Sequence, residues 1–177
     1  MVKSIAILGP ESTGKSSLAA ALAQHYHCEW VPEYAREYLE GKTERYTIED
    51  VEKIAAEQFS RNEAACRQAD SLWFADTEML VCNIWCQVVF GVIPQSIVHL
   101  TEKQQFDLYL LCAVDLPWQP DPLREHPHRR QELFNRYENE LKHLRWPYAI
   151  IRGQGNERTE CAIEAVNSLL LADDEKA

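Results

Sequence analysis

Residues 9–16, GPESTGKS, constrain the fold of this chain more than any other stretch. They match G-x-x-x-x-G-K-[ST] and lie between a short β-rich run, SIAILG, and a helical pattern, which is the context that a phosphate-binding loop requires. Glycines allow backbone N–H groups to turn toward a phosphate, and the start of the following helix adds partial positive charge. Lys15 is placed to reach the β- and γ-phosphates of a nucleotide and Ser16 to ligate Mg²⁺.

Four further apolar runs predict strands, and amphipathic or apolar segments between them predict helices. The expected strands are CEWV (28–31), SLWFADT (71–77), FDLYLLCAV (106–114) and WPYAIIRG (146–153). The expected helices include 47–69, with a Thr47-x-x-Asp50 capping box, 78–91, and 156–172 capped by Asn156. This alternation predicts an α/β fold of the P-loop NTPase, nucleotide-kinase-like type: a five-stranded parallel sheet flanked by helices. We expect one domain over residues 1–172 and a polar tail over 173–177.

Composition limits the partners. A net charge of −10 argues against nucleic acid, because neutralising phosphates along a strand needs a broad basic surface. No apolar stretch is long enough to cross a membrane and the N-terminus does not resemble a signal peptide, so we expect a cytoplasmic protein with no membrane partner. The six cysteines form no C-x-x-C pair and are interpreted as free thiols in a reducing compartment. The oligomeric state stays open.

Asp76 ends the third expected strand, which is otherwise apolar. Open parallel sheets place their ligands at the carboxyl ends of strands, so this carboxylate is expected to face the phosphate site. We interpret Asp76 as an Mg²⁺ ligand together with Ser16; the alternative is an ordinary aspartate in a turn. Glu78 either assists or caps the next helix.

The length of the chain and the absence of an N-K-x-D base-reading motif favour a small-molecule kinase over a GTPase or a motor. Such a kinase needs a carboxylate beside the acceptor hydroxyl, and Glu33 follows the second strand in VPEYAREYL. Glu33 is therefore the candidate general base. The competing interpretation is an exposed helical pair of Glu33 with Arg36, three residues apart.

A basic cluster between the fourth and fifth strands predicts a lid over residues 117–130. Arg124, Arg129 and Arg130 crowd together in an otherwise acidic chain. Pro127 suggests that a helix starts there, which would put Arg129 and Arg130 in its first turn, where cations are disfavoured unless an anion is bound. The alternative is a solvated basic face paired with Glu125 and Glu132.

These residues together resemble the ribosylnicotinamide kinase domain of NadR-like proteins. The matching stretches are GPESTGKSSL, PEYAREYL, FADTE, DLYLLCAVDLPW, DPLR and HRR, followed by PYAIIRG. The resemblance implies transfer of the γ-phosphate of ATP to the 5′-hydroxyl of nicotinamide riboside, with ATP and Mg²⁺ required. The larger members also carry an adenylyltransferase domain, and this chain has no H-x-G-H-like signature, so we expect the kinase step alone.

Carried over by position, the resemblance assigns each candidate a role. ATP-binding residues would be Gly9, Glu11, Ser12, Thr13, Gly14, Lys15, Ser16, Ser17 and Arg130. Substrate-binding residues would be Glu33, Tyr34, Arg36 and Asp76, and catalytic residues Lys15, Glu33, Asp76, Arg124 and Arg129. This chain departs from the family pattern at two positions, with Pro32 where a family member has tryptophan and Pro122 where the family has glycine. Which aromatic ring contacts the base is therefore left open among Trp30, Tyr34, Tyr38 and Trp118. The alternatives are a kinase of another nucleoside, nucleotide or small alcohol, or a nucleotide-sensing module without transferase activity.

Overall fold

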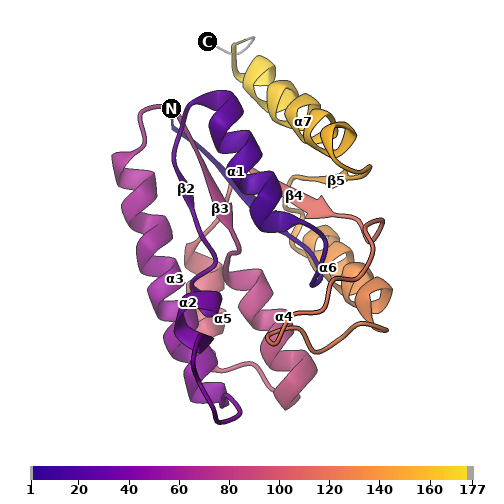
Figure 1. Cartoon of the computed structure of the whole chain (residues 1–177). Helices are drawn as coiled ribbons and strands as arrows, with labels where there is room; N and C mark the ends of the chain where they lie inside the picture. The colour runs from indigo at the N-terminus through magenta and orange to yellow at the C-terminus, as the bar shows by residue number, and fades with distance from the viewer. Residues whose placement is uncertain (1, 175–177) are drawn as a thin grey trace.

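Five parallel strands form one sheet in the order β2-β3-β1-β4-β5 in the computed structural model, which describes residues 2–174 (Figure 1). The strands are β1 (Lys3–Leu8), β2 (Trp30–Val31), β3 (Leu72–Asp76), β4 (Leu108–Cys112) and β5 (Tyr148–Ile151). The predicted five-stranded parallel sheet is therefore confirmed. β3 and β4 are buried along their whole length, as their unbroken apolar sequences predict for strands covered on both faces.

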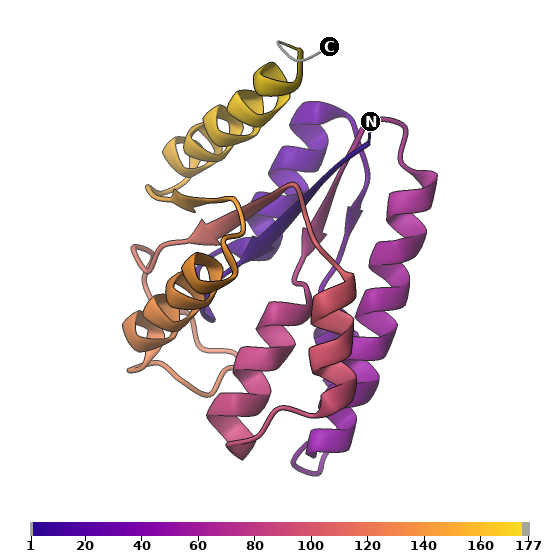
Figure 2. The ribbon, with the colours of Figure 1, turned by 180° about the vertical axis from the view of Figure 1, so that it is seen from behind.

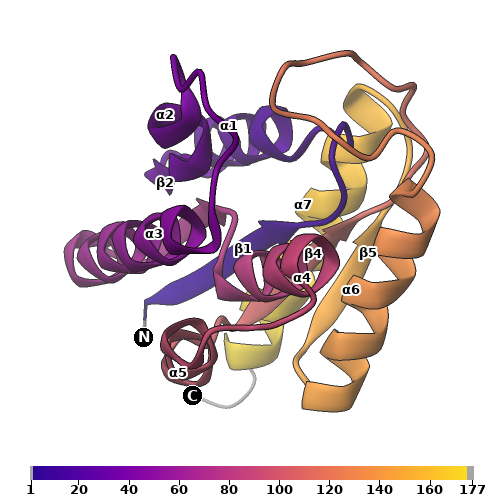
Figure 3. The same ribbon diagram turned by 90° about the horizontal axis from the view of Figure 1, so that it is seen from below.

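Seven helices connect the strands in the described part of the chain. They are α1 (Lys15–Tyr26), α2 (Tyr34–Leu39), α3 (Ile48–Gln68), α4 (Met79–Phe90), α5 (Gln95–Lys103), α6 (Arg130–Leu144) and α7 (Asn156–Asp174). Figures 2 and 3 show α1 and α7 on one face of the sheet, with α4 and α6 on the other. On the face that carries α4 and α6, α3 covers the end of the sheet that holds β2 and β3. Helix α5 packs against α3 and α4 on the side away from the sheet.

The alternation of side chains along each strand divides the core between the two faces. In β1, Ile5 and Ile7 pack with Leu22 of α1 and with α7. Ala6 and Leu8 point the other way and pack with side chains of α4 and α6. Because successive strand residues point to opposite faces, one strand contributes to both cores.

The ends of three helices test the sequence predictions. The Thr47–Asp50 capping box is confirmed, with the Thr47 side chain accepting a hydrogen bond from the backbone N–H of Asp50. The predicted start at Pro127 is wrong: residues 127–129 form a turn and α6 begins at Arg130, which leaves Arg129 as its N-cap. Asn156 is the first residue of α7 rather than its cap, because the carbonyl of Gly155 accepts the N–H of Thr159.

Two segments differ from the sequence analysis. Helix α5 at residues 95–103 was not predicted; it follows Pro94 and buries Ile97. Helix α7 continues to Asp174, two residues beyond the predicted end, and residues 175–177 of the predicted tail lie outside the described residues. None of the described helices has the length and apolar character needed to span a membrane. The cytoplasmic location stays a prediction.

Candidate active site

The carboxyl ends of the strands open into a cleft of about 840 Å³. The phosphate loop follows β1 and lines the cleft from Gly9 to Leu18, and Glu33 follows β2 and also lines it. Further lining residues come from α2, from residues 42–46, from α4, from residues 116–126, and from the first turn of α7. The cleft thus lies where open parallel sheets bind their ligands, as the sequence predicted.

The phosphate loop is held by its own side chains and by close packing on β4. The hydroxyl of Thr13 donates to the carbonyl of Pro10 at 2.7 Å, and the Lys15 ammonium donates to the same carbonyl at 3.1 Å. Gly9 has a φ of 138°, and a Cβ at this position would lie 2.9 Å from the carbonyl oxygen of Cys112. A side chain at position 9 would therefore force the loop away from the sheet.

Asp76 lies at the end of β3 and is 1% exposed. Neither of its carboxylate oxygens has a hydrogen-bond partner among the described residues. Burial, with the nearby Glu33 carboxylate, raises the pKa of Asp76 to about 6, while Lys15 and Ser16 act in the opposite direction. Such an orphaned carboxylate beside a serine hydroxyl fits Mg²⁺, a cation that prefers one or two protein oxygens and completes its shell with water and phosphate.

Glu78, two residues further on, caps α4. Its Oε2 accepts a hydrogen bond from the backbone N–H of Leu80 at 2.8 Å, and the side chain is fully buried. Burial raises the pKa of Glu78 to about 7. The sequence left open whether Glu78 assists Asp76 or caps the next helix. The structure shows Glu78 as the cap of α4.

Glu33 and Arg36 are not paired with each other. No hydrogen bond or ion pair engages the Glu33 carboxylate within the described residues, although Glu33 is the N-cap of α2. The Arg36 guanidinium instead donates to Asp121 at 2.9 Å, which links α2 to the predicted lid. The surface pair that was the competing interpretation is therefore absent from the described residues, and the Glu33 carboxylate is unpaired among them.

The segment over residues 117–130 contacts the phosphate loop directly. Glu11 accepts hydrogen bonds from the backbone N–H groups of Glu125 and His126, at 3.1 and 3.0 Å, and the Ser12 hydroxyl accepts one from Gln119 at 2.9 Å. Arg124 lines the cleft and donates to the carbonyl of Gln119 at 2.5 Å. Figure 3 shows this segment arching beside the start of α1.

Four of the predicted site residues are not among those that line the cleft: Asp76, buried at the end of β3, and also Arg129, Arg130 and Tyr34. Arg129 forms an ion pair with Glu132 at 2.8 Å on the surface of α6. For Arg129, the structure thus shows the solvated ion pair with Glu132 that was the alternative to a role in the lid. Arg130 donates to the backbone carbonyls of Ser12 and Leu116, at 3.1 and 2.9 Å, and so contacts the outside of the phosphate loop. Tyr34 lies under the Arg61 guanidinium, 4.2 Å from ring centre to Cζ.

The aromatic residues of the cleft differ from those that the sequence suggested. Trp30, Tyr34, Tyr38 and Trp118 do not line it, whereas Tyr46, Trp85 and Tyr137 do. The indole N–H of Trp85 donates to the Tyr46 hydroxyl at 3.0 Å, and that hydroxyl donates to Glu125. Trp85 belongs to a helix that is apolar on nearly every side, so its direction could not be read from the sequence.

Arg158 is a site residue that sequence reasoning missed. It is 4% exposed and donates to the carbonyls of Thr13, Ala113 and Gly153, at 2.7, 3.1 and 2.9 Å. Its guanidinium also pairs with Asp115 at 2.5 Å. Nothing in the sequence distinguishes this arginine from other charged residues of the closing helix, because three of its four contacts, with Thr13, Ala113 and Asp115, come from distant segments.

The fold and the site together define a P-loop protein with the architecture of nucleoside and nucleotide kinases. The model of the AAA domain family matches residues 4–158, and the chain belongs to this family. It is 32% identical over 127 residues to the trifunctional NAD biosynthesis/regulator protein NadR of Salmonella typhimurium and of Escherichia coli. These matches cover 70% of this chain and 31% of each relative, so the chain spans about a third of the length of the curated relatives it matches.

Solved structures agree on the fold. A NadR protein in complex with NR has a TM-score of 0.78 at 20% identity, covering 95% of this chain and 51% of that one. Thymidylate kinase from Ehrlichia chaffeensis has a TM-score of 0.70 at 12% identity and covers 95% and 98% of the two chains. Deoxyadenosine kinase from M. mycoides has a TM-score of 0.66 at 15% identity and covers 93% and 99%. The resemblance to the kinase region of NadR, predicted from the motifs, is confirmed.

Proposed function

We propose that this protein transfers the γ-phosphate of ATP to the 5′-hydroxyl of a nucleoside, with nicotinamide riboside as the acceptor. The observation that carries the proposal is the placement of an unengaged carboxylate, Glu33, in the same cleft as a complete phosphate loop. A phosphate loop alone serves many kinds of protein. A free carboxylate facing it supplies what an alcohol acceptor needs, which is a group to receive its proton.

In this reaction the acceptor hydroxyl oxygen bonds to the γ-phosphorus while the bond from that phosphorus to the β–γ bridging oxygen breaks and ADP leaves. The hydroxyl proton passes to the Glu33 carboxylate. Negative charge on the transferring group is stabilised by the Lys15 ammonium, and Arg124 lines the cleft as a second cation. Mg²⁺, when bound, neutralises phosphate charge, and Ser16 and Asp76 are the residues that would hold it.

The cleft has an aromatic lining that suits a flat, positively charged base. Tyr46, Trp85 and Tyr137 line it, and an aromatic face attracts a cation through its quadrupole. Two cations of the lining are already paired, Arg36 with Asp121 at 2.9 Å and Lys42 with Asp50 at 2.7 Å. A pyridinium would meet the free carboxylate of Glu33, while Lys15 and Arg124 would face the phosphates.

The likeness to NadR supports the same acceptor. The relatives at 32% identity are named for NAD biosynthesis, and the NadR structure at TM-score 0.78 was solved in complex with NR. The fold is also shared with a deoxyadenosine kinase and a thymidylate kinase, so another nucleoside or nucleotide is the alternative acceptor.

Steady-state kinetics with ATP test the proposal, with nicotinamide riboside compared with uridine, adenosine and ribose. Glu33→Gln should lower kcat by about 10²–10⁴-fold and leave the KM for ATP nearly unchanged, because the variant loses only the proton acceptor. Glu37→Gln is the matched control: Glu37 lies on the same helix, 63% exposed and paired with Arg61, and should keep wild-type kinetics.

The outcomes separate the parts of the proposal. Phosphorylation of another acceptor while nicotinamide riboside is ignored would show that the substrate assignment is wrong. ADP release that no acceptor stimulates would favour the nucleotide-sensing alternative. Full turnover of Glu33→Gln on the true acceptor would exclude Glu33 as the base and point to Asp76.

A further inference from the structure

The backbone around Glu33 has little support from the sheet. Strand β2 is only two residues long, and its pairing with β3 ends at Val31 opposite Ala75. Helix α2 begins immediately afterwards, at Tyr34, and Glu33 makes no side-chain capping bond that would fix its orientation. Glu33, whose carboxylate must face the cleft in the proposed function, thus lies between a two-residue strand and a six-residue helix.

One side chain of α3 compensates for this. The Oε1 of Gln58 accepts a hydrogen bond from the backbone N–H of Tyr34 at 2.7 Å, and its Nε2 donates to the carbonyl of Pro32 at 3.3 Å. The single amide therefore holds the peptide groups on both sides of Glu33. Gln58 is 1% exposed, so these bonds do not compete with solvent.

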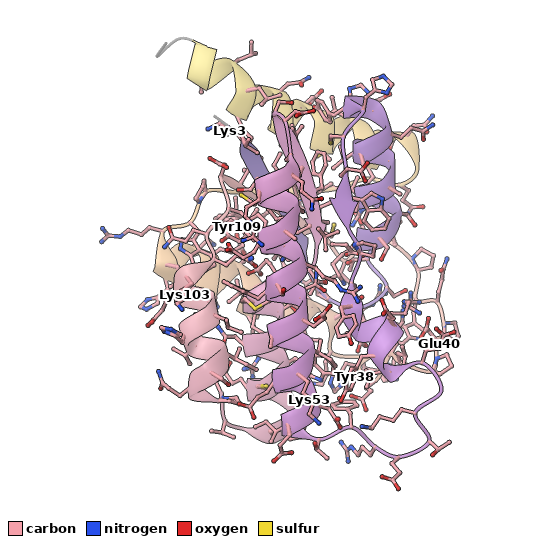
Figure 4. The ribbon with its side chains drawn as sticks, turned by 90° about the vertical axis from the view of Figure 1, so that its left-hand side faces the viewer. Lys3, Tyr38, Glu40, Lys53, Lys103 and Tyr109 are labelled. Atoms are coloured by element: carbon pink, nitrogen blue, oxygen red, sulfur yellow. The ribbon has the colours of Figure 1, made fainter. Side chains whose placement is uncertain are left out.

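The direction of this amide is set by two more buried amides. The Nε2 of Gln58 also donates to Oδ1 of Asn62 at 3.2 Å, and Nδ2 of Asn62 donates to Oε1 of Gln104 at 3.1 Å. Each amide presents its nitrogen to the next oxygen, and reversing Gln58 would turn its NH₂ against the N–H of Tyr34. Figure 4 shows α3 between α5, which ends at Lys103, and α2, so the chain of amides crosses α3 from one neighbour toward the other.

We propose that Gln58 is a positioning residue for Glu33: its amide fixes the Pro32–Tyr34 backbone so that the Glu33 carboxylate faces the phosphate loop. This inference rests on the proposed function, in which Glu33 receives the acceptor proton. Proton transfer requires the carboxylate within hydrogen-bond reach of the hydroxyl, and displacing a catalytic group by about 1 Å costs up to about 10²-fold in rate. Gln58 acts through backbone geometry and does not itself reach the cleft.

The test uses Gln58→Met, which keeps the length of the side chain and removes all three hydrogen bonds. We expect kcat to fall by about 10- to 10²-fold with the KM for ATP unchanged. Thr101→Val is the matched control, because it removes two hydrogen bonds of a buried side chain: the one that Asn83 of α4 donates to the Thr101 hydroxyl at 2.7 Å, and the one that this hydroxyl donates to the carbonyl of Ile97 at 2.9 Å. It should lower stability without lowering kcat. A loss of kcat in Thr101→Val equal to that in Gln58→Met would overturn the proposal, since general destabilisation would then explain both.

A double-mutant cycle asks whether Gln58 acts through Glu33. In the Glu33→Gln background, Gln58→Met should produce no further loss of kcat, because the group being positioned is already gone. An undiminished loss in that background would overturn the positioning role and leave the general-base assignment intact. If Glu33→Gln alone keeps full turnover, the general base of the proposed function fails first, and the two failures are distinguished.

Amide hydrogen exchange tests the anchor independently of activity. Exchange at Tyr34 should speed up in Gln58→Met and stay unchanged in Thr101→Val. Unchanged protection at Tyr34 in Gln58→Met would overturn the proposal whatever reaction the protein catalyses. Should Gln58→Met fail to fold, Gln58→Glu replaces it: this variant keeps the oxygen for Tyr34 but lacks the amide donors, and wild-type kcat in Gln58→Glu would equally overturn the proposal.

Discussion

Gly9→Ala is a direct probe of the close approach between the phosphate loop and β4. The φ of 138° at Gly9 is a backbone conformation that residues with a Cβ rarely adopt. The added Cβ would also lie 2.9 Å from the carbonyl oxygen and 3.3 Å from the amide nitrogen of Cys112. Cys112 is fully buried and paired with Ile151 of β5, so neither side of the contact can move freely.

The expected cost has two parts. Strain at a sparsely populated φ is about 1–3 kcal/mol, and overpacking against a rigid neighbour is about 1–3 kcal/mol. We therefore expect Gly9→Ala to lower the free energy of unfolding by about 2–6 kcal/mol, a large part of the roughly 5–15 kcal/mol of an ordinary domain. Gly91→Ala is the control: Gly91 has a φ of 73° with no atom within 4 Å of a Cβ, so it bears the conformational cost alone, about 1–2 kcal/mol.

Urea unfolding followed by far-ultraviolet circular dichroism measures both variants, and calorimetric titration with ATP measures the loop. Gly9→Ala should lose more stability than Gly91→Ala. It should also bind ATP more weakly, because the added Cβ would push the phosphate loop away from Cys112 of β4. Equal losses of stability with unchanged ATP affinity would refute the reasoning, since the contact with Cys112 would then carry no energy.

Three further predictions follow from single contacts. Lys15→Ala should fold normally and lose most transferase activity, because developing charge on the phosphate loses its cation; near-native turnover in initial-rate assays would contradict this. Glu11→Ala should speed hydrogen exchange within residues 117–130 in the nucleotide-free protein, since Glu11 accepts hydrogen bonds from two backbone N–H groups there. In the wild type, an ATP analogue should slow exchange in the same segment. No change in either comparison would argue against a lid. The Lys42 ammonium holds the pKa of Asp50 well below its ordinary value of 3.8, so the ionised form is favoured in the folded state. Asp50→Asn should therefore destabilise the protein at pH 7, and thermal unfolding should show that difference shrink as the pH falls below about 3.8; a difference that grew with acid would give the opposite sign.

Local patterns determined the architecture. The five strands, the parallel sheet and the capping box at Thr47 were predicted correctly because hydrophobic period and capping chemistry act over a few residues. The phosphate loop is equally local, since its glycines, lysine and serine all lie within one strand–loop–helix unit. Glu33 and Asp76 could be named as candidates because the ends of parallel strands necessarily meet at one edge of the sheet.

The rest depended on contacts between segments that are distant along the chain. Arg129 and Arg130 belong to the same basic cluster, yet one pairs with Glu132 on the surface and the other donates to the carbonyl of Ser12, a choice set by where α6 begins. Trp85 faces the cleft only because of how α4 packs against its neighbours, and the sequence of α4 is apolar on nearly every side.

Gln58 shows the same limit most clearly. Its spacing within α3 marks it as a polar residue in a helix, and only the packing of α3 against the start of α2 makes it the anchor of the Glu33 backbone. Sequence periodicity reports which side of an element is apolar. It carries no information about which distant backbone group a buried amide will meet, because that pairing is decided when all the elements pack together.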